Sequence, residues 1–215
     1  MNKINVPNRC RIVLIAPQGA SPMAVLAALS GGDVASLILP QWEMDEDEFQ
    51  SYAESIIPAA QKLGVAVVLA GEPRIAARTQ ADGIHFEGSK QALAELIEKH
   101  QAKLMVGTGA VTNRDDALEL GEVQPDYMFF GRFGFDNKPE PHARNLKLGG
   151  WWAEMVEIPA IVLGGNTLES VVDVAEIGVD FVALSSAVFA DGVDPADAVA
   201  RANTILDESA PRFEG

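Results

Sequence analysis

Hydrophobic residues follow two alternating patterns along this chain. Short continuous apolar runs, such as residues 12–16 and 66–71, are typical of strands buried on both faces of a parallel sheet. Between such runs, apolar residues recur every three or four positions, most clearly over residues 45–63, which predicts an amphipathic helix. The alternation therefore predicts a series of strand–helix units.

The predicted elements extend along nearly the whole chain. Strands are predicted over residues 12–16, 34–40, 66–71, 82–86, 103–108 and 127–131, with two more inside residues 158–190. Helices are predicted from Ser21 to Gly31, over 45–63 with a kink at Pro58, over 74–80, after Ser89, over 113–123, over 151–156, between the last two strands, and from Asp194 to about residue 208. Residues 132–148 are expected to be irregular, which makes them a candidate functional loop.

An aspartate precedes three of the predicted strands, at Asp82, Asp126 and Asp180, and this self-similarity favours a repeated architecture. No composition break marks a linker, so residues 1–215 are expected to form a single domain. Eight strand–helix units in one domain predict a single (β/α)8 TIM barrel of the α/β class. The runner-up is an open doubly wound sheet, although the first predicted strand is followed by no Gly-x-Gly-x-x-Gly motif.

Composition narrows the class of protein. The chain is 48% hydrophobic but has no apolar run long enough to span a membrane, and residues 1–7 do not resemble a signal peptide. Cys10 is the single cysteine, which excludes an intrachain disulfide and a cysteine metal cluster. We therefore expect a cytoplasmic location.

The net charge of −15 bears on partners, because such a surface repels nucleic acid and anionic membranes. Neither is expected to bind, and an anion site would have to be a local exception. The adjacent Trp151 and Trp152 could mark a contact with a second copy of the chain or simply belong to the core, so a homo-oligomer stays open.

Residues 158–190 carry the clearest chemical signal. Gly164, Gly165 and Asn166 follow one predicted strand, and Ser185 and Ser186 follow the next. In a barrel, backbone and hydroxyl donors at the ends of the seventh and eighth strands make a phosphate site, so a phosphorylated small molecule is the expected partner. Alternatively, the glycines only form a tight strand-to-helix turn.

The segment after the sixth predicted strand is basic in an otherwise acidic chain. It contains Arg132, Lys138, Arg144 and Lys147, with His142 beside them, against only Asp136 and Glu140. We interpret it as a lid that brings positive charge over the anion site, with Arg132 and Lys138 as candidate catalytic cations. The alternative is a solvated loop with ordinary surface charges.

Strand ends supply the other candidates. Gln41, Thr108 and Gly131, together with His142, are candidate substrate contacts. Glu72 and Glu87 could bind Mg²⁺, which prefers carboxylates and phosphate oxygens, or could be solvated caps. His85 lies within a strand pattern, and a core histidine with satisfied hydrogen bonds is the favoured interpretation.

Five segments, in order, resemble the thiamine phosphate synthase and thiazole tautomerase superfamily. Residues 81–86 (Ala-Asp-Gly-Ile-His-Phe) resemble its Ala-Asp-Gly-Val-His-Leu signature. The other matching segments are residues 106–108, 125–131, 162–165 and 183–188. The resemblance implies a (β/α)8 barrel that joins hydroxymethylpyrimidine pyrophosphate to thiazole phosphate with Mg²⁺. It also implies thiazole-phosphate contacts at Gly164, Gly165, Ser185 and Ser186. Lys138 would correspond to the lysine of the family's Thr-x-Thr-Lys loop.

The pyrophosphate side departs from the family pattern. Residues 39–43 lack the Arg and Lys of the family's Gln-Leu-Arg-x-Lys motif, and residues 70–72 replace its Asn-Asp-Arg. Residues 87–90 replace its Gly-Gln-x-Asp, and the tautomerase histidine falls at Val111. The first hypothesis is therefore a thiamine phosphate synthase-like transferase with a rebuilt pyrophosphate site. The alternatives are a non-catalytic barrel that binds a phosphorylated ligand, and an isomerase acting on such a ligand.

Overall fold

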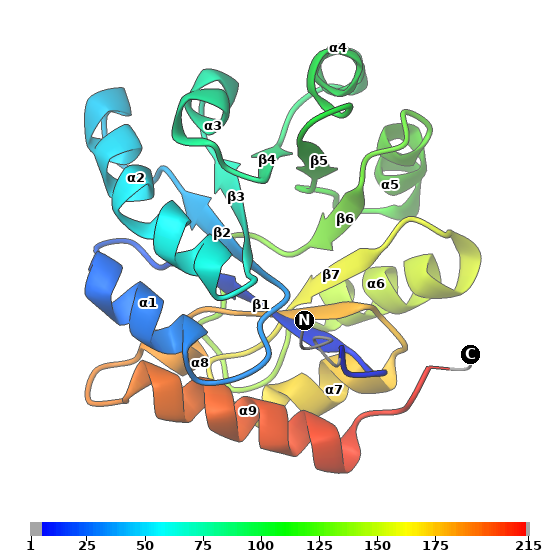
Figure 1. Cartoon of the computed structure of the whole chain (residues 1–215). Coiled ribbons are helices and arrows are strands. Elements are labelled where there is room, and N and C mark those ends of the chain that lie inside the picture. The colour runs from blue at the N-terminus through cyan, green and yellow to red at the C-terminus, as the bar shows by residue number, and fades with distance from the viewer. Residues whose placement is uncertain (1–5, 214–215) are drawn as a thin grey trace.

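The chain folds into a closed barrel of eight parallel strands, surrounded by helices (Figure 1). The computed structural model describes residues 6–213, so most of the N-terminal stretch interpreted above lies outside the described residues. Strand β1 pairs with both β2 and β8, which closes the sheet. The predicted (β/α)8 barrel is thereby confirmed over an open sheet, which would leave two edge strands unpaired.

The strands and helices alternate along the chain as the hydrophobic pattern predicts. The strands are β1 (Arg11–Ile15), β2 (Ser36–Pro40), β3 (Ala66–Ala70), β4 (Gly83–Phe86), β5 (Met105–Thr108), β6 (Tyr127–Phe130), β7 (Ala160–Leu163) and β8 (Phe181–Leu184). The helices are α1 (Pro22–Leu29), α2 (Glu46–Lys62), α3 (Pro73–Thr79), α4 (Lys90–His100), α5 (Arg114–Gly121), α6 (Ala143–Met155), α7 (Ser170–Glu176), α8 (Ser186–Phe189) and α9 (Pro195–Ser209).

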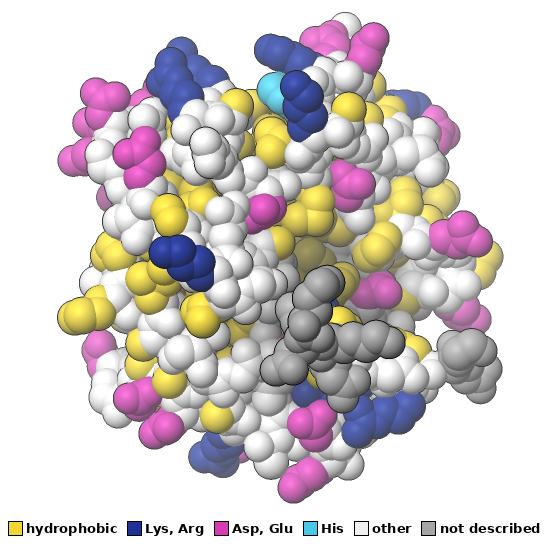
Figure 2. Space-filling view, viewed as in Figure 1, with side chains coloured by type: hydrophobic (Ala, Val, Ile, Leu, Met, Phe, Trp, Pro, Cys, Tyr) yellow, Lys and Arg dark blue, Asp and Glu magenta, His cyan; other side chains and the backbone are white. Residues whose placement is uncertain are grey.

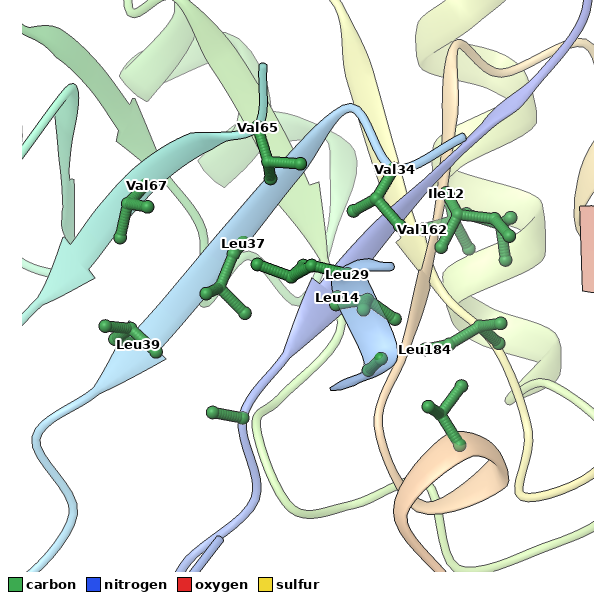
Figure 3. Packing of buried hydrophobic residues seen from close by; sticks show 14 of the residues in the cluster. Ile12, Leu14, Leu29, Val34, Leu37, Leu39, Val65, Val67, Val162 and Leu184 are labelled. Atoms are coloured by element: carbon green, nitrogen blue, oxygen red, sulfur yellow. The ribbon is translucent and has the colours of Figure 1, made fainter. Parts of the chain in front are cut away.

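Side chains that alternate along each strand build two separate cores. Leu14 and Leu37 point outward and pack with Leu29 of α1 and other apolar residues between the sheet and the helices (Figure 3). Val13 and Phe129 belong to the second cluster, which fills the barrel interior. Each fully buried aliphatic side chain contributes about 1.5–3 kcal/mol relative to an exposed one, so the two cores together hold the barrel closed.

The recurring aspartates have a shared structural role. Each lies just before an even-numbered strand and accepts a hydrogen bond from a backbone N–H at the start of the strand before it. The pairs are Asp82 with Val67 (2.7 Å), Asp126 with Val106 (2.6 Å) and Asp180 with Ala160 (2.9 Å). The sequence repeat thus marks a repeated contact at the N-terminal end of the barrel.

The prediction of an irregular segment over residues 132–148 was wrong for residues 143–148, because α6 already begins at Ala143. Gly149 and Gly150, which lie between the predicted irregular segment and the helix predicted over 151–156, are both inside α6. A Cβ at Gly149 would lie 2.3 Å from Val162 Cγ2 of β7, so this glycine lets the helix approach the sheet closely. Within α6, Trp152 is fully buried and Trp151 is partly buried against the core.

The outer surface carries many acidic side chains, as the net charge of −15 predicts (Figure 2). On the face shown in Figure 2, acidic side chains are scattered over the middle and the edge, and basic side chains form no large patch. Below this surface, the Arg9 side chain is 1% exposed and donates to Asp207, Asn203 and the carbonyl of Cys10, which ties α9 to the N-terminal end of the chain. Within residues 6–213, no helix is both long enough and apolar enough to cross a membrane.

Candidate functional site

Two adjoining cavities lie at the C-terminal ends of the strands, where barrels of this kind place their active sites. The first has a volume of about 450 Å³, and we call it the aromatic cavity. Its lining includes Gln41, Trp42, His85, Phe86, Glu87 and Phe133. Three aromatic side chains, an imidazole and an amide give it a surface that suits a flat heteroaromatic ring.

The second cavity has a volume of about 600 Å³ and is lined by residues of very different character. We call it the arginine cavity, and its lining includes Glu87, Gly131, Arg132, Phe135, His142 and Arg144. Glu87 borders both cavities, so they meet at the end of β4. A ligand with a flat ring and an anionic tail could therefore occupy both.

The floor beneath the mouth is a buried polar pair inside the barrel. His85 is 3% exposed, and its Nδ1 lies 2.9 Å from the Tyr127 hydroxyl oxygen. Burial raises the pKa of Tyr127, so its hydroxyl stays protonated at neutral pH. Gly107 makes room for this pair, because a Cβ there would lie 2.0 Å from the Tyr127 ring. The expectation of a core histidine with a satisfied hydrogen bond is confirmed.

The cations of the arginine cavity are held in different ways. The Arg132 guanidinium lies 4.1 Å from the centroid of the Phe135 ring, a stacking that leaves its N–H edges free for an anion. His142 caps α6 by accepting a hydrogen bond from the Arg144 backbone N–H at Nδ1 (3.2 Å). Because Nδ1 accepts, a neutral His142 ring carries its proton on Nε2, which can donate to a ligand.

The charge balance of the arginine cavity is the reverse of that of the whole chain. Arg132 and Arg144 both line it against one carboxylate, Glu87. Neither arginine belongs to any ion pair found within residues 6–213. Unpaired guanidinium groups in a cavity are suited to bind phosphate or pyrophosphate.

Three of the predicted phosphate donors after β7 and β8, the backbone N–H groups of Gly165, Asn166 and Ser186, are already bonded within the protein. Gly165 N–H donates to the Ser170 hydroxyl oxygen (3.0 Å), and Asn166 N–H donates to the Lys138 carbonyl (2.7 Å). A Cβ at Gly165 would lie 2.1 Å from the Pro139 carbonyl oxygen, so the segment after β6 lies directly against this glycine.

Asp136 completes the closure of this corner. Its side chain is almost fully buried, at 4% exposure, and its carboxylate accepts a hydrogen bond of 2.6 Å from Ser186 N–H. The carboxylate thus occupies a donor that the sequence assigns to a ligand phosphate. A phosphate could reach these donors only by displacing Asp136 and the backbone of Lys138 and Pro139.

The other candidate substrate residues have different outcomes. Gln41 lines the aromatic cavity, while Gly131 and His142 line the arginine cavity. Thr108 is fully buried and donates its hydroxyl to the Phe86 carbonyl (2.7 Å), so the structure does not bring it to either cavity. Lys138 is exposed and contributes its backbone carbonyl to the β7 corner, but its side chain is not part of the lining of the arginine cavity.

The two predicted metal ligands are not brought together. Glu87 borders the mouth, whereas Glu72 lines a separate cavity between α3 and α4. In the part of the chain that the structure describes, no three His, Cys, Asp or Glu side chains are grouped to hold a metal ion. These side chains therefore do not fit a Mg²⁺ ion held by the protein alone.

Two features of the site escaped the sequence interpretation. The stacking partner Phe135 and the aromatic lining at Trp42, Phe86 and Phe133 were not singled out as ligand contacts. The contact between Asp136 and Ser186 was also missed, although an acid within a basic segment was a signal for a specific partner. Residues 50 positions apart meet here, and no local pattern specifies such a contact.

Comparisons with known proteins identify the family to which this barrel is similar. A family model described as thiamine monophosphate synthase matches residues 12–188. The thiamine-phosphate synthase of Rhodospirillum centenum is 32% identical over 202 residues, covering 92% of this chain and 98% of that protein. The thiamine-phosphate synthase of Erythrobacter litoralis is 29% identical over 198 residues, covering 88% and 92%.

The fold comparison agrees with the sequence comparison. The structure of thiamine phosphate pyrophosphorylase from Pyrococcus furiosus superimposes with a TM-score of 0.79 at 20% identity, covering 94% of this chain and 98% of that one. At that identity the likeness concerns the fold alone, while the sequence match extends over most of the barrel. This chain belongs to the thiamine monophosphate synthase family.

Proposed function

We propose that this protein is a transferase of the thiamine phosphate synthase type with a rebuilt pyrophosphate site. Its substrate would be a hydroxymethylpyrimidine pyrophosphate, and its acceptor a thiazole. The observation that carries the proposal is the pair of adjoining cavities. The aromatic cavity fits the pyrimidine ring, and the arginine cavity fits the pyrophosphate.

Arg132 and Arg144 would perform the electrostatic part of the reaction. The thiazole nitrogen forms a bond to the methylene carbon of the pyrimidine, and the carbon–oxygen bond to pyrophosphate breaks. The electron pair leaves with the pyrophosphate, whose growing negative charge the two guanidinium groups stabilise. His142 would add a neutral donor from Nε2.

Lys138 and Mg²⁺ have smaller roles in this proposal than the sequence predicted. Lys138 would act at the edge of the site, since its side chain is exposed and does not line the arginine cavity. Glu87 is the carboxylate of the predicted metal pair that borders the mouth. It would serve as a protein ligand for a Mg²⁺ ion that arrives with the pyrophosphate.

A second candidate is a barrel that binds a phosphorylated small molecule without transferring a group. It is favoured by the missing metal-ligand cluster within the described residues. A third hypothesis for the same cavities is an isomerase that acts on a phosphorylated ligand.

The deciding experiment incubates the purified protein with the pyrimidine pyrophosphate, Mg²⁺ and a thiazole acceptor, supplied in phosphorylated and unphosphorylated form. The proposal expects a coupled pyrimidine–thiazole product and one equivalent of pyrophosphate, with turnover lost in Arg132→Ala. If neither acceptor gives product with Mg²⁺ or Mn²⁺, the transferase proposal is wrong. Pyrophosphate binding without product would favour the second candidate.

A further inference from the structure

The β7–β8 corner of the mouth, formed by Gly165, Asn166 and Ser186, differs from the phosphate site that its sequence suggests. Barrels commonly bind a ligand phosphate with backbone donors at the ends of strands seven and eight. Here Ser186 N–H is bonded to the Asp136 carboxylate, and the Asn166 N–H to the Lys138 carbonyl. The protein therefore supplies its own acceptors where a phosphate would supply them.

Several contacts besides the Asp136 bond hold the segment in this position. The Thr167 hydroxyl donates to the Pro139 carbonyl (3.0 Å), and Gly165 packs against that same carbonyl. Asp136 itself is nearly inaccessible to solvent. Four points of contact over residues 136–139 make this a packed arrangement rather than a chance approach of one side chain.

A carboxylate at this position acts on ligands in two ways. It occupies the Ser186 donor, and its negative charge repels a phosphate dianion in a nearly buried site, where screening by water and salt is weak. By contrast, the arginine cavity presents two guanidinium groups with no ion-pair partner inside residues 6–213. Anions therefore have a favourable site on one side of the mouth and an unfavourable one on the other.

We infer that Asp136 is a specificity-determining residue that excludes phosphate from the β7–β8 corner, so that the acceptor of the proposed reaction is a neutral thiazole rather than a thiazole phosphate. The inference rests on the proposed function for the identity of the acceptor. The exclusion of phosphate itself rests only on the contacts of Asp136.

The test follows inorganic phosphate binding by NMR on the ¹⁵N-labelled protein, because each side of the mouth has its own signal. Ser186 and Asn166 amides report on the corner, and Arg132 and Arg144 Nε groups report on the arginine cavity. In the natural protein, phosphate should shift the arginine signals and leave the two amides unchanged. In Asp136→Ser, the Ser186 amide should respond, with an affinity at the corner at least about tenfold higher.

Two further variants separate charge from space. Asp136→Asn keeps an acceptor for Ser186 N–H but removes the charge, and it should bind phosphate more weakly than Asp136→Ser. Glu140→Gln removes an exposed charge from the same segment and should behave like the natural protein. If phosphate shifts the Ser186 amide of the natural protein, or fails to shift it in Asp136→Ser, the inference is overturned.

The coupling assay provides an independent readout. Product from the unphosphorylated thiazole alone supports the inference, and product from the phosphorylated thiazole alone contradicts it. Absence of product with either acceptor would contradict the proposed function, while the NMR result would still decide whether Asp136 excludes phosphate.

Discussion

Residues 132–142 contribute to both sides of the barrel mouth. They close one side and line an open cavity on the other. On the side of β7 and β8, Asp136 and the carbonyls of Lys138 and Pro139 saturate or cover the backbone donors. On the side of β5 and β6, Arg132 and His142 line an open cavity. The contrast shows that a site is defined by which of its groups still lack partners, and not by the presence of donors alone.

The largest expected effect tests the open side. In Arg132→Ala/Arg144→Ala, pyrophosphate affinity should fall by about a hundredfold, because two charge-assisted contacts are lost. Isothermal titration calorimetry measures the change. The matched control is Lys103→Ala/Lys147→Ala, which removes the same charge from two exposed positions that do not line the cavity. Equal losses in both double variants would show that overall charge, and not the cavity, attracts the anion.

The closed side can be opened at Gly165. A Cβ in Gly165→Ala would meet the Pro139 carbonyl oxygen, so residues 136–139 should move away from the corner. We expect a loss of about 1–3 kcal/mol in the free energy of unfolding. Denaturant unfolding gives the energy, and faster hydrogen exchange of the Asn166 amide locates the change. Gly178→Ala is a useful reference because its added Cβ meets no atom within 4 Å, although its φ of +77° adds backbone strain. Unchanged exchange at Asn166 in Gly165→Ala would mean that the segment is not packed against the corner.

A smaller effect is expected from the buried pair of His85 and Tyr127 inside the barrel. Tyr127→Phe leaves the buried Nδ1 of His85 without its partner, which should cost about 1–2 kcal/mol of stability. Thermal unfolding measures the loss, and pyrophosphate affinity should stay within about twofold of the natural value, because the hydroxyl does not line the arginine cavity. A large loss of affinity would instead show that the floor positions the cations above it.

The smallest effect concerns the opposite end of the barrel and its pH dependence. The hydrogen bond from Arg9 lowers the pKa of Asp207 below its ordinary value, so this ion pair stabilises the fold above the unfolded pKa of about 3.9. The contribution is lost as the pH falls through the lower folded pKa. Asp207→Asn should therefore cost up to about 1 kcal/mol at neutral pH and less below about pH 4. Urea unfolding measured from about pH 3 to about pH 7 checks this expectation, because that range extends from below to well above the unfolded pKa of an aspartate. A difference that grows in acid would contradict the assigned sign.

The fold could be predicted from the sequence because each strand–helix unit carries its own hydrophobic period, and the periods repeat. The limits of α6 could not, since Gly149 signals a helix break unless its close approach to Val162 is known. The residues of the arginine cavity could be predicted in part, because positive charge stands out in an acidic chain. The closure of the β7–β8 corner could not, because it depends on a contact between Asp136 and Ser186 that only the folded chain creates.

The aspartates before β4, β6 and β8 also have a consequence for how the chain could be rearranged. Each ties its strand to the preceding one, and the Arg11–Asp33 pair does the same for β1 and β2 (2.7 Å). The barrel is thus assembled from four tied strand pairs. New chain termini placed in the connections between pairs, such as the one through α2 or α4, leave every tie within a continuous stretch of chain. We expect circular permutants cut there to fold more readily than permutants cut within a pair, such as in the connection through α5.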